Sequence, residues 1–127
     1  LFGPALLDAE GHALSSFSSN VRPANPRSVI GYYEPGHYCF VQVDGRGVQS
    51  RLHSGTSRGL TLAQLAAYME ALGCRAAYNM DGGQSSVMSF NGSVYNHPYL
   101  SGRDSGDFLM ICETANTEEA TDDAQDP

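Results

Sequence analysis

One short segment gathers residue types that could do chemistry. Residues 79–86 read NMDGGQSS, so a carboxylate is followed by two glycines and two hydroxyls. The carboxylate could act as a base, and the glycines would let backbone N–H groups approach an oxyanion. The same types also form an ordinary turn after a strand, and the residues alone favour neither interpretation. The candidates in this segment are Asn79, Asp81, Gly82, Gly83, Ser85 and Ser86.

Two arginines extend this group of candidates. Arg27 lies just before one expected strand, and Arg103 lies in a loop before another. A guanidinium suits bidentate contact with a phosphate, although most arginines at such positions are solvated surface charges. Near a Gly-Gly turn, the two would form an anion clamp. Asp44 opens a further Asp-Gly-Arg turn, which is equally an ordinary turn.

The elements that must position these residues begin with a hairpin and a helix. The β-rich runs 28–33 and 38–43 are separated by a Glu-Pro-Gly turn, which predicts a hairpin. Residues 61–72 show helical spacing of apolar side chains, with a capping box of Thr61 and Gln64 at the start. Gly73 suits a left-handed C-cap. The expected apolar stripe of this helix is Leu62, Leu65, Ala66, Met69 and Leu72.

The second half of the chain reads as further strands. Residues 74–80 predict a strand, and residues 86–90 and 93–95 flank the hairpin turn Asn-Gly. A loop is expected at 96–106. The apolar run 108–112 predicts a strand buried on both faces, and residues 4–8 could hold one more short strand. The whole pattern predicts an α+β fold, a mostly antiparallel sheet with one main amphipathic helix packed on it.

Five motifs, taken in order and spacing, resemble the phosphodiester glycosidase family, whose members include N-acetylglucosamine-1-phosphodiester α-N-acetylglucosaminidases and bacterial exopolysaccharide-associated proteins. The resemblance runs from about Arg22 to Ile111. Its motifs are residues 25–31, 43–46, 59–62, 72–74 and 79–88. Gln84 replaces a third glycine of the family pattern. The family's N-terminal half is not visible, so we expect residues 1–112 to be the C-terminal part of such a domain, paired with a missing N-terminal segment or self-associated.

The resemblance implies a role for each candidate. Arg27 and Arg103 would hold a phosphate with the help of the Gly82 and Gly83 amides, and Asp81 would serve the sugar. Arg27 and Asp81 are thus the expected catalytic residues. The expected substrate-binding residues are Asn79, Gly82, Gly83, Ser85, Ser86, Arg103 and Asp44. The implied reaction is hydrolysis of a sugar-1-phosphodiester of the GlcNAc-1-phosphate type in envelope or exported glycans, by a secreted or envelope protein.

Two other functions compete with hydrolysis of a glycosyl phosphate. A non-catalytic glycan- or phosphate-binding module would keep the same anion pocket without turnover. A serine hydrolase would use Ser85 or Ser86, but the chain has no Gly-x-Ser-x-Gly motif and no histidine placed by sequence to activate either.

Composition narrows the classes of partner. The net charge of −7 comes mostly from residues 113–127, an expected acidic tail, because residues 1–112 contain eight acidic and seven basic residues. This balance does not suggest nucleic-acid binding, and no apolar run is long enough for a membrane span. No cofactor is required, although Asp44, Asp81 and Asp104 could offer oxygen ligands to Ca²⁺ or Mg²⁺.

The three cysteines leave the disulfide question open. Cys39 and Cys112 lie in apolar runs, which favours buried thiols, and Cys74 follows the helix. A disulfide is compatible with a secreted protein, but the sequence does not select a pair.

Overall fold

A three-stranded antiparallel sheet, in the order β2-β1-β5, lies at the centre of the fold in the computed structural model, which describes residues 3–113. Strand β1 (Arg27–Glu34) is the middle strand and pairs with β2 (His37–Val43) and β5 (Ala76–Asn79). The remaining elements are short apart from one helix: β3 (Val48–Gln49), β4 (Thr56–Ser57), α1 (Leu62–Ala71), η1 (Gly83–Ser85), β6 (Ser89–Phe90), β7 (Ser93–Val94) and η2 (Tyr99–Ser101). The α+β class expected from the sequence is therefore confirmed.

The β1–β2 hairpin forms where the turn residues predict it. Gly36 takes a left-handed φ of +80°, which glycine adopts without steric cost. In the register, Val29 lies opposite Val41 and Gly31 lies opposite Cys39. These four residues share the face of the sheet that points into the core.

The helix α1 owes its ends to local signals. The Thr61 side chain accepts from the Gln64 backbone N–H at 3.1 Å, and the Gln64 side chain accepts from the Thr61 N–H at 3.0 Å. Gly73 has φ +82° just after the helix. The buried residues are Leu62, Leu65, Ala66 and Met69, as the periodicity predicts. Leu72 is the exception: it caps the helix and is 38% exposed.

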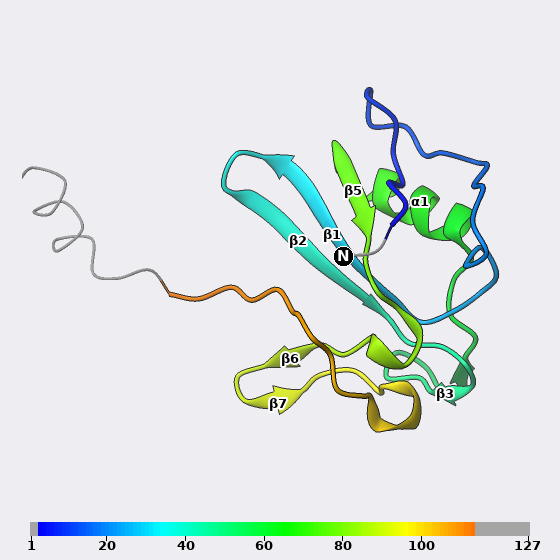
Figure 1. Cartoon of the computed structure of the whole chain (residues 1–127), viewed down its shortest axis with the longest axis vertical. Helices are drawn as coiled ribbons and strands as arrows, with labels where there is room; N and C mark the ends of the chain where they lie inside the picture. The colour runs from blue at the N-terminus through cyan, green and yellow to red at the C-terminus, as the bar shows by residue number, and fades with distance from the viewer. Residues whose placement is uncertain (1–2, 114–127) are drawn as a thin grey trace, which may run out of the picture.

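The core lies between α1 and one face of the sheet (Figure 1). Alternation along β1 buries Val29 on this face and leaves Ile30 partly exposed on the other. The N-terminal segment closes the core beside β5, where Ala5 forms an isolated bridge with Tyr78. The expected strand at 4–8 is thus reduced to single bridges. Core side chains from outside the helix include Leu6, Leu7, Phe17, Val29 and Ala77.

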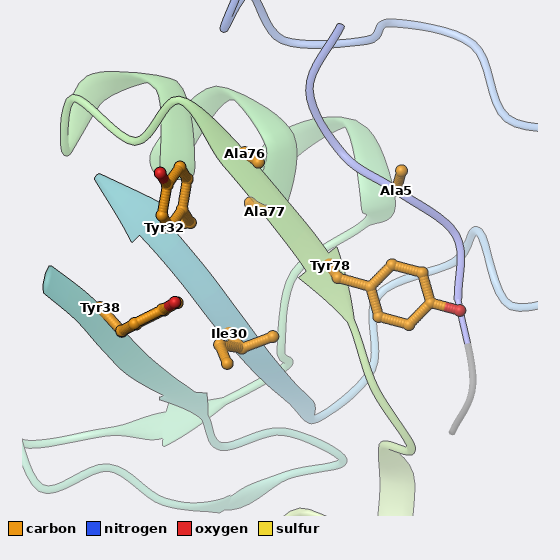
Figure 2. A pocket seen from close by; sticks show the side chains of 7 residues that line it. All are labelled: Ala5, Ile30, Tyr32, Tyr38, Ala76, Ala77 and Tyr78. Carbon is orange, nitrogen blue, oxygen red and sulfur yellow. The ribbon is translucent and has the colours of Figure 1, made fainter. Parts of the chain in front are cut away.

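The opposite face of the sheet carries aromatic side chains. Figure 2 shows Ile30, Tyr32 and Tyr38 on this face, lining a shallow hollow of about 240 Å³ together with Tyr78. The rings of Tyr32 and Tyr38 lie 5.5 Å apart in a tilted arrangement. Helix α1 lies on the far side of the sheet in this view.

The shorter elements gather at one end of the sheet, where β1 begins and β2 and β5 end (Figure 1). Here β3 pairs with β4, and β6 pairs with β7. The β6–β7 turn uses Asn91 and Gly92, both with positive φ, as their sequence predicts. The strands themselves are shorter than expected.

The expected buried strand at 108–112 is wrong. Phe108 is 75% exposed and Ile111 is 80% exposed, and among residues 3–113 no strand pairs with this run. An apolar run needs a neighbouring strand to satisfy its backbone before it can be buried. Cys112 is accordingly exposed rather than buried. Residues 114–127, which hold almost all of the expected acidic tail, lie outside the described residues. No described helix has the length and apolar character of a membrane span.

Candidate functional site

An ion pair forms directly after β5. Arg103 Nη2 donates to Asp81 Oδ2 at 3.1 Å, and Arg103 Nε donates to Ser85 Oγ at 2.6 Å. We call these three residues the Asp81 cluster. Both charged side chains are about half exposed, at 47% for Asp81 and 53% for Arg103. One guanidinium therefore bridges a carboxylate and a hydroxyl at the surface.

The loop that carries Arg103 is held by Gln84. The Gln84 side-chain amide donates to the Gly102 carbonyl at 2.8 Å. Gly102 has φ +81°, and a Cβ there would lie 3.0 Å from the Val87 side chain. Gln84, which departs from the family pattern, thus fixes η1 to the residue before Arg103.

Asp44 holds the same loop from the sheet side. Its Oδ1 accepts from Asn96 Nδ2 at 2.8 Å, and its Oδ2 accepts from the His97 backbone N–H at 3.0 Å. Asn96 in turn bonds the Ser86 carbonyl and the Met88 N–H. Both carboxylate oxygens of Asp44 thus serve to position the loop, and its expected contact with substrate stays a prediction.

A second arginine, Arg46, lies on the other side of η1. Its guanidinium stacks over the Tyr99 ring, 5.0 Å from the centroid. Its Nε donates to Asn25 Oδ1 at 3.3 Å. A Cβ on Gly83 would lie 2.9 Å from Arg46 Nη2, so the guanidinium packs directly against this glycine. The sequence shows Arg46 in a turn within a family motif, but its place beside η1 depends on contacts that sequence spacing does not reveal.

The two glycines of the segment act as packing residues. A Cβ on Gly82 would lie 2.5 Å from the Pro26 carbonyl oxygen, so only glycine fits there. The Gly83 N–H donates to the same carbonyl at 3.1 Å. This amide is already used inside the protein, contrary to the expectation that it faces an oxyanion.

Arg27 lies below the surface, 2% exposed. Its Nε donates to the Leu60 carbonyl at 3.0 Å, and its Nη2 donates to the carbonyls of Val21 and Pro23 at 2.7 and 2.6 Å. Burial lowers the pKa of this guanidinium from its usual value. These contacts join the segment before β1 to the segment before α1. The expected phosphate contact of Arg27 stays a prediction, and none of these bonds supports it.

Asn79 and Ser86 also point into the protein. Each is 1% exposed, and Asn79 Nδ2 donates to the Gly3 carbonyl at 2.9 Å. Asn79 Oδ1 and Ser86 Oγ are buried without a hydrogen-bond partner among the described residues. Of the candidate segment, only Asp81 and Ser85 reach Arg103 at the surface.

The cluster is not arranged as a nucleophile with its base. Ser85 Oγ accepts from a guanidinium, which cannot take up the proton of a serine. His97 Nδ1 lies 2.5 Å from the Gln49 carbonyl oxygen instead. Among residues 3–113, no three His, Cys, Asp or Glu side chains gather as a metal site. A role for Ca²⁺ or Mg²⁺ stays a prediction.

Two hollows in the surface lie apart from the cluster. One, of about 270 Å³, is lined by Ser18, Ser19, Asn20 and Arg22, and the other lies on the open face of the sheet. None of the three cluster residues lines either hollow. The Asp81 cluster therefore lies on an exposed surface, outside both hollows.

Comparisons with known proteins agree with the motif pattern. A family model described as phosphodiester glycosidase matches residues 1–112. A solved structure described as a hypothetical protein from Synechocystis matches with a TM-score of 0.58 and 24% identity, which shows a common fold. The match covers 80% of this chain and 18% of that one. No curated protein matches.

Proposed function

Because this chain belongs to the phosphodiester glycosidase family, we propose that the Asp81 cluster binds a sugar-1-phosphodiester and that the protein hydrolyses the bond between sugar and phosphate. The observation that carries the proposal is the position of Arg103, which touches a carboxylate and a hydroxyl at once. A cation, an acid and a neutral donor are the groups that a phosphate and a sugar require.

Arg103 suits the phosphate side of such a ligand. A guanidinium has five N–H donors, and its bonds to Ser85 and Asp81 use Nε and Nη2. The remaining donors can meet phosphate oxygens while Asp81 keeps the side chain in place. Arg46 adds a second positive charge across η1. The guanidinium groups of Arg103 and Arg46 offer an anion two positive charges at this surface.

Asp81 suits the sugar side. The leaving phosphate monoester is stable as an anion, so it needs positive charge more than a general acid. A carboxylate close to the anomeric carbon would activate water or face the oxocarbenium-like transition state. Ser85 would orient a phosphate oxygen or a sugar hydroxyl. In this mechanism Arg103 binds the leaving group, and Asp81 is the catalytic carboxylate.

The finer assignments follow from the family resemblance. We propose a GlcNAc-1-phosphate diester in envelope or exported glycans as the substrate, and a secreted or envelope location for the protein. The chain spans only about a fifth of the length of the solved structure that it matches. We therefore propose turnover for the complete domain, in which this chain is joined by the expected N-terminal segment or by a second copy of itself.

The test is release of GlcNAc from a GlcNAc-1-phosphodiester by the purified domain, with the N-terminal segment that the family resemblance implies restored. We expect Asp81→Asn to lower turnover by about 100-fold or more while substrate still binds. Arg103→Met should weaken binding by about tenfold or more, because a charge-assisted contact is lost. The matched control is Arg75→Met, which removes an exposed arginine at the opposite end of β5. Full turnover by Asp81→Asn would contradict the catalytic role.

One observation favours a second candidate, a non-catalytic binding module. Glycoside hydrolysis usually employs two carboxylates, and the carboxylate of Asp44 already holds Asn96 and His97. Titration calorimetry with GlcNAc-1-phosphate separates the two functions. Binding that depends on Arg103, without release of sugar from the diester, would identify the binding module. Absence of both binding and release would reject the anion site itself.

A further inference from the structure

Two of the three cysteines meet inside the core. Cys39 on β2 and Cys74, two residues before β5, place their Sγ atoms 3.9 Å apart. The two residues are separated by 35 positions in the chain. Their thiols reach each other across the middle strand, β1.

Gly31 on β1 makes this meeting possible. A Cβ at this position would lie 2.7 Å from the sulfur of Cys39 and 2.7 Å from that of Cys74. It would also lie 2.8 Å from Met69 Cε. Any larger residue would occupy the space in which the two sulfurs approach each other. The glycine therefore leaves room for a sulfur–sulfur contact.

The third cysteine lies elsewhere. Cys112 is exposed, and its thiol contacts Met110 in the segment after Arg103. Cys74 is 3% exposed, and Cys39 is partly exposed. The structure thus separates one surface thiol from one internal pair, a distinction that cysteine spacing alone does not make.

We propose that Cys39 and Cys74 form a disulfide site that links β2 to the connection between α1 and β5. A disulfide bond is about 2.05 Å long, so the sulfurs must approach each other by about 2 Å over Gly31. The link would enclose β3, β4 and α1 in one covalent loop. This inference is independent of the proposed function, because neither cysteine touches the Asp81 cluster.

The reaction is thiol–disulfide exchange with a dissolved disulfide such as oxidised glutathione. The Cys39 thiolate, the more accessible of the two, attacks one glutathione sulfur and releases the other glutathione as a thiolate. The Cys74 thiolate then attacks Cys39 Sγ and releases the second glutathione. Two protein thiols lose two protons and two electrons, and one glutathione disulfide is reduced to two thiols.

The surroundings determine how this exchange depends on pH. Burial raises the pKa of the Cys74 thiol. Interaction with the thiols of Cys39 and Cys74 raises the pKa of Tyr33. The resolving step therefore becomes faster as the pH rises, because the thiolate is the attacking form.

Mass spectrometry of the oxidised protein tests the assignment. Trypsin cleaves after arginine, so Cys39 lies in fragment 28–46, Cys74 in fragment 59–75 and Cys112 in fragment 104–127. After incubation with oxidised glutathione, we expect fragment 28–46 linked to fragment 59–75, with a loss of two hydrogen atoms. Thiol titration in denaturant should fall from three thiols to one, or to none where the exposed Cys112 also carries a glutathione. A link through Cys112, or a glutathione adduct on Cys39 that never resolves, would overturn the proposal.

Variants separate the pair from the surface thiol. Cys112→Ser should still form the link and should titrate no thiols after oxidation. Cys74→Ala should form no link, and its folded state can be checked by circular dichroism. The linked protein should melt about 10 °C above the reduced protein, because the closed loop restricts the unfolded chain. An unchanged or lower melting temperature would reject a stabilising link at this position.

Discussion

Two regions of the molecule use arginine in opposite ways. One is the sheet–helix unit, made of β1, β2, β5 and α1, and the other is the region after β5, residues 80–113. In the sheet–helix unit, Arg27 is buried and donates to backbone carbonyls. In the region after β5, Arg103 is half exposed and donates to a carboxylate and a hydroxyl. The guanidinium group of Arg27 thus supports the fold, whereas that of Arg103 faces solvent.

The sheet–helix unit thus contributes mainly to stability, and the region after β5 carries the candidate binding groups. The core draws on α1, the sheet and the N-terminal segment, and none of its buried members comes from residues 80–113. Binding and catalytic groups commonly lie on loops that a rigid scaffold positions. Substitutions in the sheet–helix unit should therefore destabilise the protein, and those after β5 should alter ligand contacts.

The largest expected effect is a cavity in the core. Leu65→Ala removes a fully buried side chain of α1 and should lower the free energy of unfolding by about 3 kcal/mol. Leu100→Ala, in η2, is the matched control because Leu100 is 66% exposed. It should cost about 0.5 kcal/mol or less. Urea denaturation measures both, and equal losses would break the proposed division between the two regions.

The two arginines give the next largest contrast. Arg27→Met keeps the length of the side chain but leaves buried carbonyls without a donor, which should cost about 2 kcal/mol. Arg103→Met should change stability by about 1 kcal/mol or less, since it breaks an exposed ion pair. The urea midpoints of the two variants compare these losses, provided that the free energy of unfolding depends on urea concentration with the same slope in both. A stable Arg27→Met protein that fails to bind phosphate would instead place Arg27 in the anion site.

Asp44 connects the two regions, so its removal should have an intermediate effect. Asp44→Ala deletes the acceptor for Asn96 and for the His97 N–H, with an expected loss of about 1–2 kcal/mol. Hydrogen exchange should become faster at His97 and Met88, while the amides of β1 stay protected. The control is Asp104→Ala, which removes an exposed carboxylate in the region after β5. Faster exchange in β1 would show that the regions unfold together.

The smallest effect should come from Asp8, a surface carboxylate of the N-terminal segment. The backbone N–H of His12 donates to it at 2.8 Å and lowers its pKa below the ordinary value of 3.8. A lowered pKa means that the contribution to stability is present above the ordinary value and is lost as the pH falls through the lowered one. Loosening of residues 8–12 in acid, followed by NMR, should therefore occur below pH about 4. In Asp8→Asn this loosening should no longer depend on pH.

The sequence predicts features that depend on neighbouring residues better than features that depend on residues far apart in the chain. The helix cap at Thr61 and the hairpin turn at Gly36 arise within a few residues, and both were predicted correctly. The strand expected at 108–112 was wrong, because burial of that run needs a partner strand that its own residues do not specify. Asp81, Ser85 and Arg103 were chosen by residue type, and the structure brings all three together.

The sequence by itself determined the α+β pattern, the family and the residue types of the candidate site, since periodicity, turns and motifs are local properties of the chain. Only the tertiary structure decided which of those residues meet. Asp44 contacts Asn96 across 52 positions, and Arg46 contacts Asn25 across 21. Such contacts depend on how the elements pack, and packing buried Arg27 while it left Arg103 at the surface.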